Sequence, residues 1–126
     1  MKVTRLWAGN ITSGLGVPFM LLDGATHLMA PPPVVEAFHR LRFPLSLAVP
    51  LGIVEVLCVA VYVFPRTSVL GAVLLTGYLG GAVASHVRVG DPVFPSVFPI
   101  LIGVLFWGGL SLRDDRLRTL IERKEK

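Results

Sequence analysis

Acidic, histidine and tyrosine side chains that could bind a polar ligand or carry a proton are spaced through otherwise apolar segments of this chain. Glu55 is the single charged residue in the stretch LSLAVPLGIVEVLCVAVYVF at 45–64. A carboxylate at the centre of a membrane-spanning helix costs about 2.5–3.5 kcal/mol even on insertion scales, so such a residue faces a partner or a cavity. Glu55 is therefore the first candidate functional residue.

Other side chains that exchange hydrogen bonds or protons fall at a similar predicted depth. Asp23 and His27 are four residues apart, which places them on one face of a helix. If successive spans alternate in direction, these two residues and Glu55, together with Tyr78, Ser85 and His86, all lie between the membrane midplane and the outer face. Because polar groups in a bilayer point inward, we predict one outward-facing pocket or polar network, with Arg88 at its rim. Its members are Asp23, His27, Glu55, Tyr78, Ser85, His86 and Arg88.

Each of these groups also has a purely structural interpretation. Asp23 and His27 could form a capping pair at a helix end. Glu55 could serve only to fix packing through a hydrogen bond with Tyr78. His86 could be an ordinary residue of the membrane–water interface. These alternatives stay open at the level of the sequence.

Several kinds of chemistry are not expected. Asp23, His27, Glu55 and His86 could in principle ligate a metal, but carboxylate di-metal bundles use Glu-x-x-His pairs on two helices, and the predicted spans carry none. We therefore expect no metal site. The single cysteine, Cys58, excludes an intrachain disulfide and a CxxC redox motif. No phosphate loop or nucleophile elbow occurs, so no catalytic residue is assigned.

The composition indicates that membrane-spanning helices hold these residues. Hydrophobic residues make up 53% of the chain and charged residues 16%, with a mean hydropathy of +0.72, which is more apolar than a typical soluble domain. Four apolar segments, at about 7–29, 45–64, 69–87 and 93–112, are each long enough to cross a hydrocarbon core of about 30 Å. We predict an all-α membrane protein, an antiparallel four-transmembrane-helix bundle that forms a single domain over 1–126.

Shorter features are predicted around these spans. The segment 34–41 follows three prolines and alternates apolar and polar residues at helical spacing, so a short interfacial helix should join the first two spans. The basic tail at 113–126 repeats this pattern and places Leu117 and two further apolar residues on one face. Gly77 and Gly81 form a GxxxG pair, which predicts a close helix approach near the pocket.

The positions of Lys and Arg predict the orientation. A net charge of +4 could suggest a nucleic-acid partner, but the cations lie at helix ends and in the tail, as in multi-pass membrane proteins. Nine of them fall on the side of the two termini and the 65–67 turn, and three fall on the other side. Both termini are therefore predicted to be cytoplasmic, and no nucleic-acid partner is expected.

Several short stretches resemble a known family. They are Trp7-Ala8-Gly9, Asp23-Gly24, PPVVEAF at 32–38, Gly52-Ile53-Val54-Glu55, Pro65-Arg66-Thr67 and, above all, LGAVLLTGYLGGAVASHVRVGDP at 70–92. By these residues the chain is similar, over nearly its full length, to the DoxX-like family of small four-span bacterial membrane proteins. One departure is Arg42-Phe43-Pro44, where the resemblance leads us to expect a glycine before the aromatic residue. This difference touches a surface loop and not the pocket.

The resemblance implies an inner-membrane location and a redox association. The family name comes from a subunit associated with a thiosulfate:quinone oxidoreductase, and other relatives are linked to oxidative-stress complexes in the membrane. The resemblance thus implies a quinone as the cofactor. It implies no other cofactor. The family positions that look polar and inward correspond to Asp23, Glu55, Tyr78 and His86.

Three classes of function remain. The first is a redox-associated subunit whose pocket takes a quinone-like or other small apolar molecule. The second is a non-catalytic scaffold or assembly subunit, bound to a protein partner or to a second copy, in which the polar network only specifies packing. The third is a proton-coupled small-molecule transporter. The charge bias disfavours it, because small exporters of that kind often insert in both orientations. The sequence does not choose between the first two, nor does it decide whether the chain is an enzyme.

Overall fold

The computed structural model describes residues 2–122, and over that range it is built from helices and the turns between them. The long helices are α1 (Lys2–Met29), α3 (Ala48–Val63), α4 (Ser68–Arg88) and α5 (Val93–Arg113), and the short ones are α2 (Pro32–Arg40), the 3-10 helix η1 (Leu45–Leu47) and α6 (Asp115–Ile121). The all-helical prediction is confirmed for this part of the chain. The end of the predicted basic tail, 123–126, lies outside the described residues.

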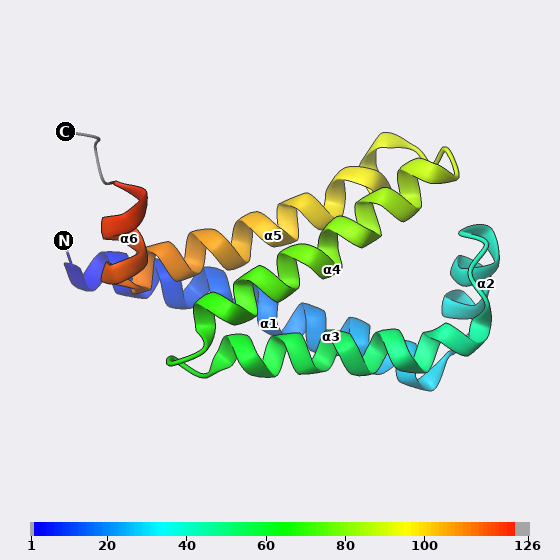
Figure 1. The fold of residues 1–126 in the computed structure, drawn as a ribbon, viewed down its shortest axis with the longest axis horizontal. Coiled ribbons are helices and arrows are strands. Elements are labelled where there is room, and N and C mark those ends of the chain that lie inside the picture. The colour runs from blue at the N-terminus through cyan, green and yellow to red at the C-terminus, as the bar shows by residue number, and fades with distance from the viewer. Residues whose placement is uncertain (1, 123–126) are drawn as a thin grey trace.

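The four long helices lie lengthwise beside one another (Figure 1). α1 and α4 run away from the end that holds the termini, and α3 and α5 run back toward it. α1 packs on α3 and α5, and α4 packs on the same two helices. Toward the far end the α1/α3 pair and the α4/α5 pair move apart, and α2 lies across that end (Figure 1).

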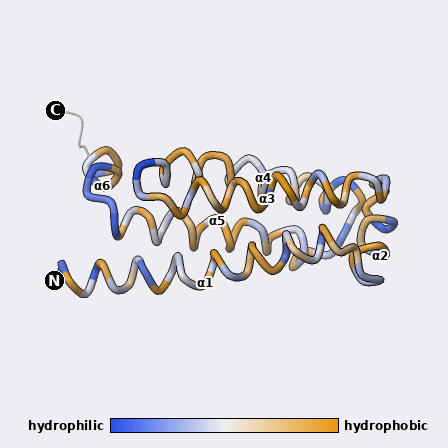
Figure 2. The backbone as a smooth tube through the Cα atoms, turned by 90° about the horizontal axis from the view of Figure 1, so that it is seen from below, coloured by the Kyte–Doolittle hydropathy of each residue, from blue (hydrophilic) through white to orange (hydrophobic). Residues whose placement is uncertain are grey.

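Three of the long elements have the length and apolarity of membrane spans, namely Leu45–Val63, Ser68–Arg88 and Val93–Arg113. Figure 2 shows apolar residues along the long helices and hydrophilic residues gathered at the two ends. α1 has 28 residues and extends about 42 Å at 1.5 Å per residue, but glycines, Asn10 and Asp23 lower its hydropathy. α1 is therefore not among the helices that are apolar enough to count as membrane spans. The count of four spans stays a prediction.

The end of the molecule near the termini is tied by a buried tyrosine. Tyr62 is 1% exposed and packs edge to face on Phe106, with the ring centroids 4.8 Å apart. Its hydroxyl donates to the Phe106 carbonyl oxygen (2.8 Å), accepts from Arg113 Nη2 (3.2 Å) and lies 2.8 Å from Ser13 Oγ. Because the buried hydroxyl of Tyr62 has three hydrogen-bond partners, we assign this residue a structural role.

Two glycines allow α1 and α3 to approach each other closely. A Cβ atom on Gly52 would lie 2.9 Å from the carbonyl oxygen of Gly24 and 3.0 Å from His27 Cβ, and a Cβ atom on Gly24 would lie 2.8 Å from Val56 Cγ2. Larger residues at either position would therefore push the two helices apart. This crossing brings Glu55, one turn beyond Gly52, against the polar side of α1.

We predicted that another helix of the chain packs closely against the GxxxG pair, and this prediction is wrong. Gly77 and Gly81 have nothing within 4 Å of the position that a Cβ atom would take, and both lie on the exposed side of α4. The sequence pattern identified two small residues at helical spacing correctly. It could not show which way they face.

The connection between α1 and α3 begins with the predicted short helix. Two prolines occupy the first positions of α2, where a missing backbone N–H costs no hydrogen bond. Phe38 is buried beneath the helix. Arg42, which follows it, has a φ of 60°, a left-handed conformation that glycine adopts most easily. This backbone conformation agrees with the glycine that we expect before the aromatic residue.

Candidate acid, histidine and tyrosine site

Glu55 is the most enclosed polar side chain of the bundle. It is 0% exposed, on the face of α3 that lies between α1 and α4. Its Oε2 atom accepts a hydrogen bond of 2.9 Å from the hydroxyl of Tyr78 on α4. Its Oε1 atom is buried and has no hydrogen-bond partner among residues 2–122. One of the two carboxyl oxygens of Glu55 therefore lacks a hydrogen-bond donor in the described part of the chain.

α1 brings two further groups to this point. His27 Nδ1 lies 3.7 Å from Glu55 Oε2 and 3.6 Å from Asp23 Oδ2. The same nitrogen lies 2.7 Å from the carbonyl oxygen of Asp23. One ligand-type atom from each of these three residues can be chosen so that all lie within 4.8 Å of one another. We call Asp23, His27, Glu55 and Tyr78 the acid network.

Exposure falls steadily from one side of the acid network to the other. The side chain of Asp23 is 43% exposed, that of His27 18% and that of Glu55 0%. Asp23 thus lies at the surface of the bundle and Glu55 lies at its centre.

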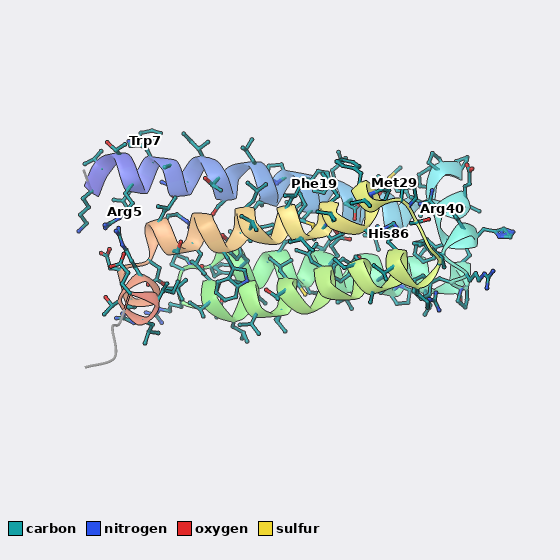
Figure 3. The ribbon with its side chains drawn as sticks, turned by 90° about the horizontal axis from the view of Figure 1, so that it is seen from above. Arg5, Trp7, Phe19, Met29, Arg40 and His86 are labelled. Atoms are coloured by element: carbon teal, nitrogen blue, oxygen red, sulfur yellow. The ribbon has the colours of Figure 1, made fainter. Side chains whose placement is uncertain are left out.

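The other predicted site residues lie in different contacts. His86 Nδ1 hydrogen-bonds to Asp91 Oδ2, and that oxygen also lies 3.5 Å from Arg40 Nη2. Figure 3 shows His86 and Arg40 at the same end of the molecule. Arg88 donates to the carbonyl oxygen of Leu41 at 2.6 Å. These contacts tie the end of α4 and the following turn to the end of α2.

Ser85 and Phe38 complete the surroundings. Ser85 Oγ donates to the carbonyl oxygen of Gly81 in its own helix, 2.7 Å away. The ring of Phe38 packs edge to face on His27, with the centroids 5.6 Å apart. α2 therefore covers the acid network at the end where α2 lies.

The predicted set of seven residues is thus brought together only in part. Four of them form the acid network, and Ser85, His86 and Arg88 make the separate contacts just described. Sequence reasoning missed Asp91, although a carboxylate five residues after His86 in a Gly-containing turn was a usable signal.

The matched family covers most of this arrangement. The model of the DoxX-like family matches residues 11–109. The chain belongs to the DoxX-like family. The matched range contains the acid network, two of the three apolar helices and most of the third, Val93–Arg113, so this DoxX-like chain is an integral membrane protein. No curated protein and no solved structure matches it.

The acid network gives this DoxX-like protein a defined chemical capacity. A carboxyl group can donate a proton when it carries one and accept a hydrogen bond when it does not. Tyr78 orients Glu55, and His27 lies between the two acids. The arrangement can bind a molecule that carries a carbonyl or hydroxyl oxygen, hold a cation, or pass a proton between Asp23 and Glu55.

Proposed function

We propose that this DoxX-like protein is a redox-associated membrane subunit. In this proposal the acid network binds the oxygen-bearing head of a quinone-like or other small apolar molecule. The observation that carries the proposal is the enclosed carboxyl group of Glu55, which is held by Tyr78 through Oε2 and has an unpartnered Oε1.

The unpartnered oxygen favours a ligand over a packing role. A buried polar atom without a hydrogen bond costs about 1–3 kcal/mol, and a residue that only locks packing gains nothing from that cost. The tyrosine at the other end of the bundle, Tyr62, illustrates the structural case, because its hydroxyl is fully used. Glu55 differs from it in having an atom available for another molecule.

The proposal includes a fourth span and an orientation. α1 packs along α3 and α5, is long enough to cross the bilayer, and turns Ser13 and His27 toward the other helices rather than toward lipid. With four spans, the nine-to-three bias in Lys and Arg puts both termini in the cytoplasm. The acid network then lies in the outer half of the membrane.

The chemistry assigned to the network is hydrogen bonding and proton exchange. The protonated Oε1 of Glu55 donates to a quinone carbonyl oxygen, and the ionised form accepts from a quinol hydroxyl. Asp23, at the surface, exchanges protons with the medium. The electrons come from a partner protein in the same membrane complex or from a diffusible donor.

Quinone binding to the purified protein tests the proposal. The protein is treated with EDTA in detergent and titrated with a short-chain benzoquinone by calorimetry. Glu55→Gln preserves the shape of the side chain, so the variant should fold as wild type while its affinity falls at least tenfold. Tyr78→Phe should also weaken binding, and His86→Gln serves as the matched control that leaves it unchanged.

One result would favour the scaffold function instead. If Glu55→Gln binds the quinone as wild type does, or if wild type does not bind it, the quinone proposal fails. A Glu55→Leu variant that is more stable than wild type would then indicate that the acid only specifies packing.

A further inference from the structure

Two carboxylates and an imidazole meet at one point inside the bundle. Asp23, His27 and Glu55 each offer a ligand atom within 4.8 Å of the others. Ligands bonded to one metal ion at about 2.0–2.2 Å are necessarily within about 4.4 Å of each other. Small shifts of three side chains would therefore bring all three onto one ion.

A second observation shows that the buried carboxyl group at this place can take a further partner. Glu55 is fully enclosed, and its Oε1 atom has no hydrogen-bond partner in the described range 2–122. Buried charges in proteins are paired or coordinate metals. A cation between Asp23 and Glu55 would remove the repulsion that their two ionised carboxylates would have in surroundings of low dielectric constant.

The neighbours of these three residues resemble the surroundings of a metal site. His27 Nδ1 is the nitrogen that faces both acids, 3.6 Å from Asp23 Oδ2 and 3.7 Å from Glu55 Oε2. It also lies 2.7 Å from the carbonyl oxygen of Asp23, so binding an ion through Nδ1 requires the imidazole to exchange that contact for the metal. Tyr78 holds Glu55 through Oε2, as an outer-shell partner does. The side chain of Asp23 is 43% exposed, so it is the one of the three ligands that is open to the outside of the bundle.

We propose that Asp23, His27 and Glu55 bind one divalent transition-metal ion between α1 and α3. One nitrogen and two carboxylate ligands suit Mn²⁺, Fe²⁺ or Zn²⁺. The expectation of no metal rested on the lack of Glu-x-x-His pairs in the predicted spans, which is a criterion for sites with two metals. A site for a single ion needs only the three donors that the α1–α3 crossing brings together.

Cobalt binding tests this proposal without any quinone. The purified protein is stripped with EDTA in detergent and titrated with Co²⁺, whose visible absorption reports nitrogen and oxygen ligands. We expect one saturable Co²⁺ per chain. Asp23→Asn and Glu55→Gln should each weaken binding by about 100-fold or more. Tyr78→Phe removes an outer-shell partner and should weaken it about tenfold.

Asp91→Asn is the matched control, because Asp91 is the carboxylate of the other histidine pair, and its variant should bind Co²⁺ as wild type does. Wild type without saturable binding up to millimolar Co²⁺ would overturn the proposal. So would an Asp23→Asn variant weakened less than tenfold, which stays decisive if Glu55→Gln fails to fold, because Asp23 is partly exposed.

The metal proposal and the quinone proposal can be refuted independently of each other. Quinone binding is measured on protein stripped of metal, and Co²⁺ binding is measured without quinone. Protein that binds the quinone but not Co²⁺ would overturn only the metal proposal, and the reverse result would overturn only the proposed function.

Discussion

The hydrogen bond from Tyr78 to Glu55 joins α3 to α4 and can be removed without changing the shape of either helix. Tyr78→Phe deletes the hydroxyl and keeps the ring. Side-chain hydrogen bonds in membrane proteins contribute about 0.6 kcal/mol on average and about 1.7 kcal/mol at most. Glu55 is 0% exposed and already has one unpartnered oxygen, so we expect a loss near the upper value, about 1.5 kcal/mol.

A double-mutant cycle isolates this bond. In a Glu55→Leu background, Tyr78→Phe should cost almost nothing, because the hydroxyl then has no carboxylate to donate to. The coupling energy should therefore be about 1–2 kcal/mol. It is measured by unfolding EDTA-stripped protein from mild detergent into SDS. Ser85→Ala provides the control, because Ser85 bonds within its own helix and its effect should add to that of Glu55→Leu.

A coupling energy below about 0.3 kcal/mol would refute this reasoning. Such a value lies within the additivity observed for independent sites. It would mean that Tyr78 does not hold Glu55, and that the orientation assigned to the buried carboxyl group is wrong.

Further predictions concern topology, packing and backbone conformation. Cysteines placed at position 36 or 120, in a chain with Cys58→Ser, should react oppositely with a membrane-impermeant reagent, and labelling of position 120 in intact cells would overturn the orientation. Gly71→Ala should destabilise the protein by about 1–3 kcal/mol in SDS unfolding, because its Cβ atom would overlap the backbone of α3. Gly77→Ala, which faces open space, is the control and should be neutral or stabilising. Arg42→Gly should stabilise the protein by about 1 kcal/mol by relieving a left-handed backbone, and a destabilised variant would contradict this.

The helices could be predicted because their length and apolarity are set by the membrane. The C-terminal ends of the predicted segments 45–64, 69–87 and 93–112 lie within one residue of the ends of α3, α4 and α5. α1 instead begins at Lys2, five residues before the predicted start, because its first turn is polar yet contains no helix-breaking residue. Hydropathy indicates where a chain is apolar, and a helix continues until something ends it.

The sequence predicts the acid network only from the depth at which each residue should lie in the membrane. Depth places Asp23, Glu55 and Tyr78 at comparable levels but does not say which way a side chain points around its helix. His86 follows Tyr78 by eight residues, which at 100° per residue turns it by about 80°, and it meets Asp91 instead. The glycines at the α1–α3 crossing also carried too little pattern to be distinguished from Gly77 and Gly81.

The two ends of the bundle are held together by different kinds of interaction. At the end near the termini, Tyr62 is buried and hydrogen-bonded to three other residues. At the opposite end, α2 is held to the α4–α5 turn by contacts that include Arg40, whose side chain is 57% exposed, and Asp91, whose side chain is 8% exposed. Salt screens a partly buried ion pair much less than a pair of exposed charges, and it does not weaken buried packing. We therefore expect high salt to loosen the contact between α2 and the α4–α5 turn only slightly and to leave the packing around Tyr62 unchanged.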